Sequence, residues 1–302
     1  MDEHITDSRR RLKGILCALF GGISWGFSGA CGQYIFSNYQ VDSAWLATVR
    51  MLIAGVVLST IYIIKNKKQS FDIFKEKRNI TELILFAITG IGLCQFAYLL
   101  AIKYTNAGTA TVLQYVAPVI VMIFVCVTGK TLPKKKEVLA IILALTGILL
   151  IATHGDMGNL VISGKGLFWG IMAALGLFFY TVLPGRMTGQ WGSLPVIGYS
   201  MLLCGVGFAL ATRFWTVSVE LDIKGILAVG VLSIVGTMIA FMLYLQGVSC
   251  IGPVKASMIS SVEPVSAAIF SVFWLGSKFM WIDIVGFACI LFTVFLLAKK
   301  EK

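Results

Sequence analysis

Residues 108–129 read GTATVLQYVAPVIVMIFVCVTG and contain no charged side chain. A helix needs roughly 20 mostly apolar residues to cross about 30 Å of hydrocarbon, so this stretch is long enough to span a bilayer. The strands of a membrane barrel would instead alternate between apolar and polar residues over about ten positions. These residues do not alternate, and they therefore predict a transmembrane α-helix.

Similar apolar blocks fill most of the 302-residue chain. Its hydrophobic fraction is 58% and its charged fraction is 13%, whereas soluble domains are about 45–50% apolar and about 25% charged. In lipid, each spanning segment must satisfy its own backbone polar groups, which favours helices. We therefore expect an all-α integral membrane protein with ten transmembrane helices, at approximately residues 13–34, 44–64, 83–103, 108–129, 137–153, 164–184, 194–213, 224–246, 254–275 and 280–298.

The net charge of +11 would suggest nucleic acid as the partner of a soluble protein, but here the basic residues lie at the ends of apolar blocks. Nineteen of the 25 Lys and Arg residues fall in the N-terminal tail, every second loop and the C-terminal tail, and five fall in the other loops. Because cytoplasmic loops are enriched in Lys and Arg, both termini are predicted to be cytoplasmic, in the plasma (inner) membrane. That requires an even number of spans. The expected partner is the lipid bilayer and not nucleic acid.

The two halves of the chain align at an offset of 146 residues, which places Gly90 on Gly236 and Pro118 on Pro264. Each half holds five predicted spans, so the second half starts on the opposite side of the membrane and the repeats are inverted. Inverted repeats are typical of secondary transporters, whose site lies near the midplane between the repeats. We expect repeats at residues 13–153 and 164–298, an outer linker at 154–163, and cytoplasmic tails at 1–12 and 299–302.

Each half also carries a mid-helix proline, in Ala117-Pro118 and Glu263-Pro264, and a closing apolar segment, at residues 129–151 and 276–297. With Arg50 in the second span, these features resemble the drug/metabolite transporter superfamily, specifically its ten-helix EamA-type branch, over residues 13–298. The family often has Gly-Glu at the end of the fourth helix of each repeat. This chain has Gly-Lys at 129–130 and Gly-Ser at 276–277, so a gate that uses that glutamate is not expected.

The resemblance implies a permease for small polar metabolites that works by alternating access. Amino acids or related compounds are the first expectation for the substrate, and export is the first expectation for the direction. Uptake of a nucleoside, a sugar or an organic acid is the alternative within the same fold. A non-transporting membrane receptor or scaffold is the alternative from another class. Protons are a candidate coupling ion, and the oligomeric state stays open.

Two charged residues lie inside predicted spans. Arg50 is about six residues into its span, roughly 9 Å along the helix, so it could line a cavity as an anion-binding or gating residue, or snorkel to the interface. Glu263 lies about midway along its span, where ionisable residues usually mark a functional site. We expect Glu263 to carry a proton, to pair with Arg50 or to bind a cationic substrate group. The alternative is a neutral side chain that hydrogen-bonds between helices.

Polar residues form one stripe on each of the two proline-containing helices. The spacing i, i+3, i+4, i+7 places them on one face of a helix, and polar atoms are disfavoured against lipid. Both stripes are therefore predicted to face inward and to line the pathway, or alternatively only to hold helices together. They comprise Thr111, Gln114 and Tyr115, and Ser257, Ser260 and Ser261. On the same faces, Pro118 and Pro264 are expected to break their helices and to free backbone carbonyls, which could bind substrate or let the helix flex.

Six further polar or aromatic residues within the spans are candidates for the pathway. Trp and Tyr often anchor helices at the membrane interface, but Trp25 lies about mid-span and is expected to wall the cavity or to pack. The candidates are Gln95, Tyr98, Tyr244, Trp25, Ser28 and Tyr180.

The sequence lacks the motifs that other functional classes require. An enzyme would need a nucleophile with a base, or a metal cluster, but both histidines, His4 and His154, lie outside the spans. A pump driven by ATP would need a Gly-rich phosphate loop, which the sequence does not contain. We therefore expect no enzymatic activity, no metal and no cofactor.

Overall fold

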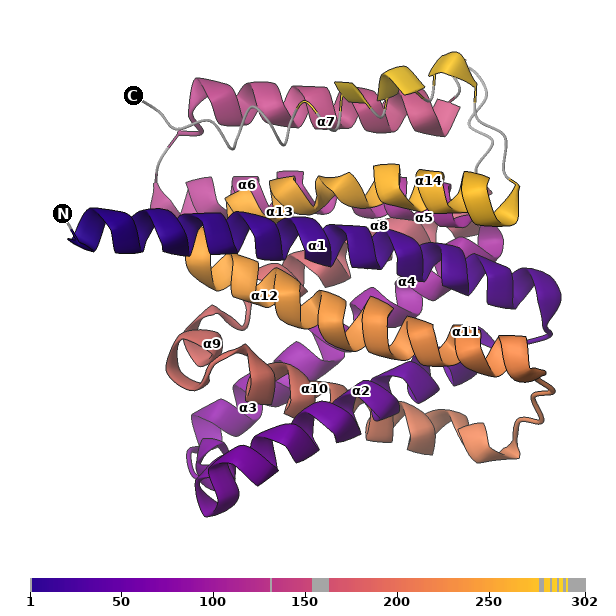
Figure 1. Cartoon of the computed structure of the whole chain (residues 1–302), viewed down its shortest axis with the longest axis horizontal. Coiled ribbons are helices and arrows are strands. Elements are labelled where there is room, and N and C mark those ends of the chain that lie inside the picture. The colour runs from indigo at the N-terminus through magenta and orange to yellow at the C-terminus, as the bar shows by residue number, and fades with distance from the viewer. Residues whose placement is uncertain are drawn as a thin grey trace.

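The computed structural model describes residues 2–130, 132–153 and 163–276, together with residues 280–282, 284–286, 288–289 and 292. All regular structure in these residues is helical, and Figure 1 shows the helices stacked side by side. In the part of the chain that the structure describes, seven helical segments are long and apolar enough to cross a membrane, at Ser8–Asn38, Ser43–Phe74, Lys77–Tyr104, Gly164–Val182, Ser193–Thr212, Ile223–Ile251 and Pro253–Leu275. The prediction of an all-α membrane protein is therefore confirmed.

The predicted spans 108–129 and 137–153 are helical but are not among these seven segments. The span predicted at 280–298 and the linker at 154–163 lie mostly outside the described residues, so the number ten stays a prediction. The elements are α1 (Asp2–Asn38), α2 (Ser43–Asn66), η1 (Lys67–Phe74), α3 (Lys77–Leu85), η2 (Phe86–Gly92), α4 (Leu93–Tyr104), α5 (Ala107–Gln114), α6 (Ala117–Gly129), α7 (Lys135–Thr153), α8 (Gly164–Val182), α9 (Gly185–Trp191), α10 (Ser193–Thr212), η3 (Phe214–Thr216), α11 (Ile223–Ser233), η4 (Ile234–Ile239), α12 (Ala240–Ile251), α13 (Pro253–Ile259), η5 (Ser260–Val262) and α14 (Glu263–Leu275).

Polar side chains start several of these helices. Asp42 caps α2 by accepting from the backbone N–H groups of Ala44 (2.8 Å) and Trp45 (3.3 Å). Asp222 caps α11 through the N–H of Gly225 at 2.7 Å. Such caps satisfy donors that a helix leaves free at its first turn, and they explain why these helices begin where the apolar blocks begin.

The long helices are interrupted at matching positions. The π-helical turns η2 and η4 both contain one of the glycines that align at the 146-residue offset, Gly90 and Gly236. The helix pair α5 and α6 is broken at residues 115–116, and the 3-10 turn η5 interrupts the later helix at residues 260–262. Proline lacks an N–H and disrupts the preceding turn of a helix, which accounts for a break before Pro118 and before Pro264.

Glycines let helices touch backbone to backbone. A methyl group at Gly55 would lie 2.6 Å from Leu202 Cα, so α2 and α10 pack directly together. A methyl group at Gly176 would lie 2.5 Å from Cys94 Cα, which brings α8 against α4. Small residues are the usual means of close helix packing in membranes. In Figure 1, α1 runs between α14 on one side and α12 with α11 on the other, and it contacts all three.

Candidate substrate site

A small closed cavity lies where α1, α2, α4, α5, α8, α12 and α14 converge. Its volume is about 20 Å³, which is room for about one water molecule. Seven of the residues predicted from the sequence to line a pathway share this cavity, although they come from five different helices. The lining residues are Trp25, Ser28, Arg50, Cys94, Gln95, Tyr98, Gln114, Leu177, Phe241 and Glu263.

Arg50 on α2 is only 2% exposed, so its side chain does not snorkel to the membrane interface. Its Nε donates a hydrogen bond to Thr237 Oγ1 at 2.8 Å. The Thr237 hydroxyl, in the π-helical turn η4, in turn donates at 3.0 Å to the carbonyl of Leu232, five residues earlier at the end of α11. The turn therefore fixes Thr237, and Thr237 holds one edge of the guanidinium while the rest faces the cavity.

Four donor-bearing side chains at this cavity have an atom without a hydrogen-bond partner among the described residues. They are Trp25 Nε1, Ser28 Oγ, Arg50 Nη1 and Gln95 Nε2, and all four atoms are buried. Buried polar groups in native proteins are nearly always hydrogen-bonded. Four such atoms around one cavity mark a place where a further polar group can bind.

Glu263 is also 2% exposed and begins α14. The Tyr115 hydroxyl lies 3.1 Å from Glu263 Oε2 and is also hydrogen-bonded to the carbonyl oxygen of Ser260. A phenol has one proton to donate. When that proton goes to the Ser260 carbonyl, the contact with Glu263 is a hydrogen bond only if the carboxyl group itself carries a proton.

Arg50 and Glu263 share the cavity lining but form no ion pair in the part of the chain that the structure describes. The pairing considered as one alternative from the sequence is therefore absent from this conformation. Each charge-bearing group is instead held by a hydroxyl group, Thr237 for Arg50 and Tyr115 for Glu263. The two are left free to interact with a third molecule in the cavity.

The stripe on α5 contributes directly to the site and its supports. Gln114 lines the cavity and its Nε2 donates to Cys94 Sγ at 3.3 Å. Thr111 Oγ1 lies 2.8 Å from the Tyr98 hydroxyl, which also lines the cavity. Pro118 lies in the first turn of α6, just beyond the break in the helix.

The serine stripe on the later helix behaves differently. Ser257 Oγ donates to the carbonyl of Val254 and Ser260 Oγ donates to the carbonyl of Ser257, each at 2.9 Å, and Ser261 Oγ donates to the carbonyl of Met258. All three hydroxyls therefore bond within their own helix and none of the three residues lines the cavity. Pro264 is buried in the first turn of α14 beside Glu263.

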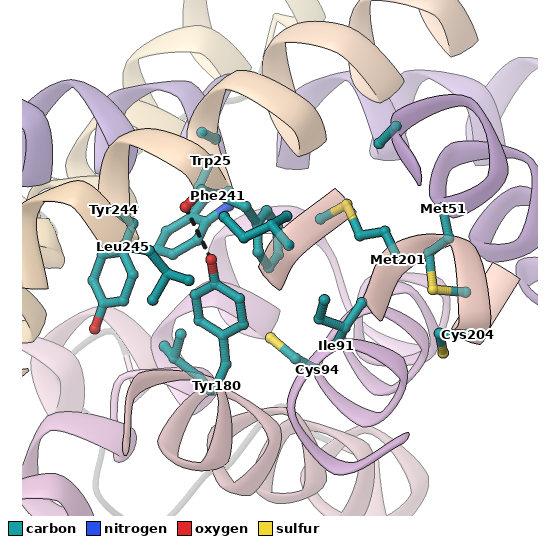
Figure 2. Close-up of a cluster of buried hydrophobic side chains, with 14 of the residues drawn as sticks. Trp25, Met51, Ile91, Cys94, Tyr180, Met201, Cys204, Phe241, Tyr244 and Leu245 are labelled. Atoms are coloured by element: carbon teal, nitrogen blue, oxygen red, sulfur yellow. Dashed lines mark hydrogen bonds between the residues drawn. The ribbon is translucent and has the colours of Figure 1, made fainter. Parts of the chain in front are cut away.

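Aromatic side chains form the wall behind Trp25, as Figure 2 shows. The ring of Trp25 lies 4.8 Å from that of Tyr244, 5.0 Å from that of Phe241 and 6.4 Å from that of Tyr180, centroid to centroid. The Tyr180 hydroxyl donates to the Phe241 carbonyl at 2.9 Å, and that of Tyr244 is 2.8 Å from Thr181 Oγ1. Tyr180 and Tyr244 therefore support the wall and do not line the cavity.

Sequence reasoning missed Cys94, Leu177, Phe241 and Thr237. Cys94 could have been found, because it lies one helical turn before Tyr98 and so shares its face. Leu177 and Phe241 look like any other apolar residue of a span. The role of Thr237 depends on the π-helical turn. Such a turn directs its side chains to a different side of the helix than an α-helix would, so helical spacing does not predict their direction.

The long apolar helices are those of an integral membrane protein, and the buried polar cavity lies between them. A family model described as the EamA-like transporter family matches the chain twice, at residues 12–153 and 164–299. The chain belongs to this family, which confirms the resemblance drawn from the sequence.

Named relatives agree with this family. The chain is 38% identical over 294 residues to the uncharacterized inner membrane transporter YicL of Salmonella typhimurium, covering 96% of each chain. It is 24% identical over 270 residues to the uncharacterized transporter YetK of Bacillus subtilis, covering 84% of this chain and 78% of that one. A solved crystal structure matches with a TM-score of 0.72 at 17% identity over 96% of this chain and 97% of that chain, which shows a shared fold.

Proposed function

We propose that this protein is a secondary transporter of small polar metabolites, with amino acids or related compounds as the first class of substrate and export as the direction. The observation that carries the proposal is the burial of Arg50 and Glu263 at one closed cavity without an ion pair between them. An unpaired guanidinium and a carboxyl group are suited to the two ends of a zwitterion. The inner membrane is the expected location, in keeping with the name of the Salmonella relative.

The proposed architecture is ten helices in two inverted repeats, at residues 13–153 and 164–298. Three observations support it. The family model matches twice with nearly these bounds. The interruptions η2 and η4 lie at the offset of the sequence repeat, as do the breaks at 115–116 and 260–262. The helix α1 packs on α12 and α14, and α8 packs on α4 and α6, which are the corresponding helices of the opposite half.

The proposed mechanism is alternating access. A cavity of about 20 Å³ cannot hold a metabolite, so the helices around it must separate to admit substrate and close again around it. Glu263 is the proposed proton-binding group. Its hydrogen bond with Tyr115 fits a protonated carboxyl group in the closed conformation, and loss of that proton would let Tyr115 donate to Glu263 instead of to Ser260.

Counterflow tests the proposal. Purified protein in proteoliposomes, preloaded with unlabelled amino acids, is given a pool of labelled amino acids with and without an imposed pH gradient. We expect saturable exchange above the rate of protein-free liposomes. Exchange of nucleosides, sugars or organic acids alone would instead support the alternative substrates. Binding without flux of any solute would point to a receptor or scaffold and would contradict the transporter proposal.

A further inference from the structure

The polar atoms at the cavity that have no hydrogen-bond partner among the described residues are mostly hydrogen-bond donors. The four atoms without a partner among the described residues are on α1 (Trp25 and Ser28), α2 (Arg50) and α4 (Gln95). Three of them are nitrogen donors that cannot accept a hydrogen bond. A water molecule can accept only two hydrogen bonds, so one water cannot satisfy this set. An anionic oxygen pair can.

The charge balance points the same way. Arg50 is buried with no carboxylate bonded to it among the residues that the structure describes, and a buried charge is costly unless it is paired. Its Nε is occupied by Thr237, which leaves the outer nitrogens of the guanidinium to present the parallel N–H groups that fit a carboxylate. A single cation balances a single negative charge, whereas a phosphate carries about −1.5 to −2 at neutral pH.

We infer that Trp25, Ser28, Arg50 and Gln95 form a subsite for one carboxylate group of the transported solute. The inference rests on the proposed function, because it assigns half of the proposed substrate site. Arg50 supplies the charge, and Ser28, Gln95 and Trp25 supply hydrogen bonds to the same two oxygens. The carboxylate enters once the helices separate, and on closure it satisfies the donors that have no partner among the described residues.

The carboxylate could belong to an amino acid or to a simple organic acid. In an amino acid, the ammonium group would extend toward Glu263, which lines the same cavity. An organic acid has no group for Glu263 and would leave it protonated. The shared chemistry is the carboxylate, and binding measurements with the two kinds of solute distinguish the sources.

The test compares acids with their own amides, which differ in charge but hardly in shape. Purified full-length protein in nanodiscs is titrated with the standard amino acids and their amides, and with small monocarboxylates such as lactate and their amides. Thermal stabilisation gives the affinity. A buffer of low ionic strength without chloride, sulfate or phosphate is used, because these anions could occupy the same donors. We expect at least one acid to bind at least tenfold more tightly than its amide.

Three variants test whether the preference for an acid over its amide arises at this subsite. Gln95→Glu is isosteric and places a negative charge among the donors, so the preference for acid over amide should be lost while Arg50 gains a partner that keeps the fold stable. Arg50→Lys keeps the charge but loses the parallel N–H groups, and it should show a reduced preference. Arg186→Met removes an arginine outside the cavity lining and should leave the preference of the folded protein unchanged.

The outcomes separate this inference from the proposed function. Equal binding of every acid and its amide, or a Gln95→Glu variant with the wild-type preference, overturns the subsite even if counterflow occurs. A preference for acids that Gln95→Glu abolishes supports the subsite even if no flux is found. Preference for amino acids over organic acids identifies the zwitterion as the ligand, and the reverse order identifies the organic acid.

Discussion

Two arginines of this protein have opposite surroundings. Arg186 on α9 is about one-third exposed, and its Nε contacts both carboxylate oxygens of Glu82 at 3.0 and 2.9 Å. Its other nitrogens donate to Asn79 at 2.5 Å and to Gln190 at 3.1 Å. Arg50 is 2% exposed, yet its one hydrogen bond among the described residues is to Thr237. The arginine near water has a full set of protein partners, and the arginine away from water does not.

The contrast indicates that the two arginines have different roles. Arg186, with Glu82, ties the start of the α3–α4 helix to the segment between α8 and α10, so its partners account for its presence. For Arg50 the fold provides too few partners, although burial makes each missing one more costly. Folding alone would favour an apolar residue at position 50. The difference teaches that a buried charge with unused donors indicates a ligand, whereas a well-partnered surface charge indicates a structural link.

The largest effect is expected when each of the two arginines is replaced in turn, which tests the comparison directly. Arg50→Met should lower the initial rate of counterflow at limiting substrate at least tenfold, because a hydrogen bond to a charged group contributes about 1.5–3 kcal/mol, or roughly ten- to a hundredfold in affinity. Arg186→Met should lower the yield or melting temperature but leave the rate per folded protein near that of wild type. Similar losses of rate in both folded variants would contradict the distinction.

A smaller effect is expected when the carboxyl groups of Glu263 and Glu82 are replaced, which extends the comparison to the acidic residues. Glu263→Gln keeps a hydrogen-bonding side chain next to Tyr115 but cannot exchange a proton, so counterflow should persist and lose its response to an imposed pH gradient. Glu82→Gln, at the surface partner of Arg186, is the matched control and should keep the response. Glu263 would be rejected as the proton carrier if Glu263→Gln proteoliposomes still responded to the gradient as wild type does.

The smallest expected effect concerns an exposed contact on the other side of the molecule, where the Tyr39 hydroxyl donates to Asp222 Oδ1. The hydrogen bonds from Tyr39 and from the Gly225 N–H hold the pKa of Asp222 below its usual range. A lowered pKa stabilises the folded protein above the unfolded-state pKa of about 3.9, and that contribution is lost as the pH falls through the folded-state pKa.

Asp222→Asn should therefore lower the melting temperature slightly at pH 7. The gap between the variant and the wild-type protein should narrow as the pH falls below about 4. Thermal denaturation in detergent across this pH range measures both. A gap that stays constant with pH would mean that the ionised carboxylate contributes nothing to stability.

The sequence predicted the positions of the helices well where long apolar blocks end at polar caps. The span expected at 44–64 is α2 at Ser43–Asn66, and that expected at 164–184 is α8 at Gly164–Val182. The length of an apolar block and the charges at its ends can be read from the sequence, so the predicted ends of these helices agree with the structure. A count of apolar residues does not show the interruption of the 108–129 span at residues 115–116, but Pro118 predicts a helix break there because it lacks an N–H.

The candidate site was predictable only in part. Depth within an apolar block selected Arg50 and Glu263, and the structure brings both to one cavity. Helical spacing placed Ser257, Ser260 and Ser261 on an inward face, but their hydroxyls bond to carbonyls three residues earlier. A serine in a helix can bond to its own backbone or to a neighbour, and spacing does not decide between them.

The packing of α1 on α14 has a mechanical consequence. A methyl group at Gly26 would lie 2.6 Å from the Glu263 carbonyl oxygen, and one at Gly22 would lie 2.7 Å from that of Ser260. Such contacts bring the backbones of α1 and residues 260–267 directly together, so we expect the two segments to move as one unit. Trp25, Ser28 and Glu263 would then move together. The hydrogen bonds of Tyr115 join residues 260–263 to the end of α5, and we expect them to break before the cavity can widen.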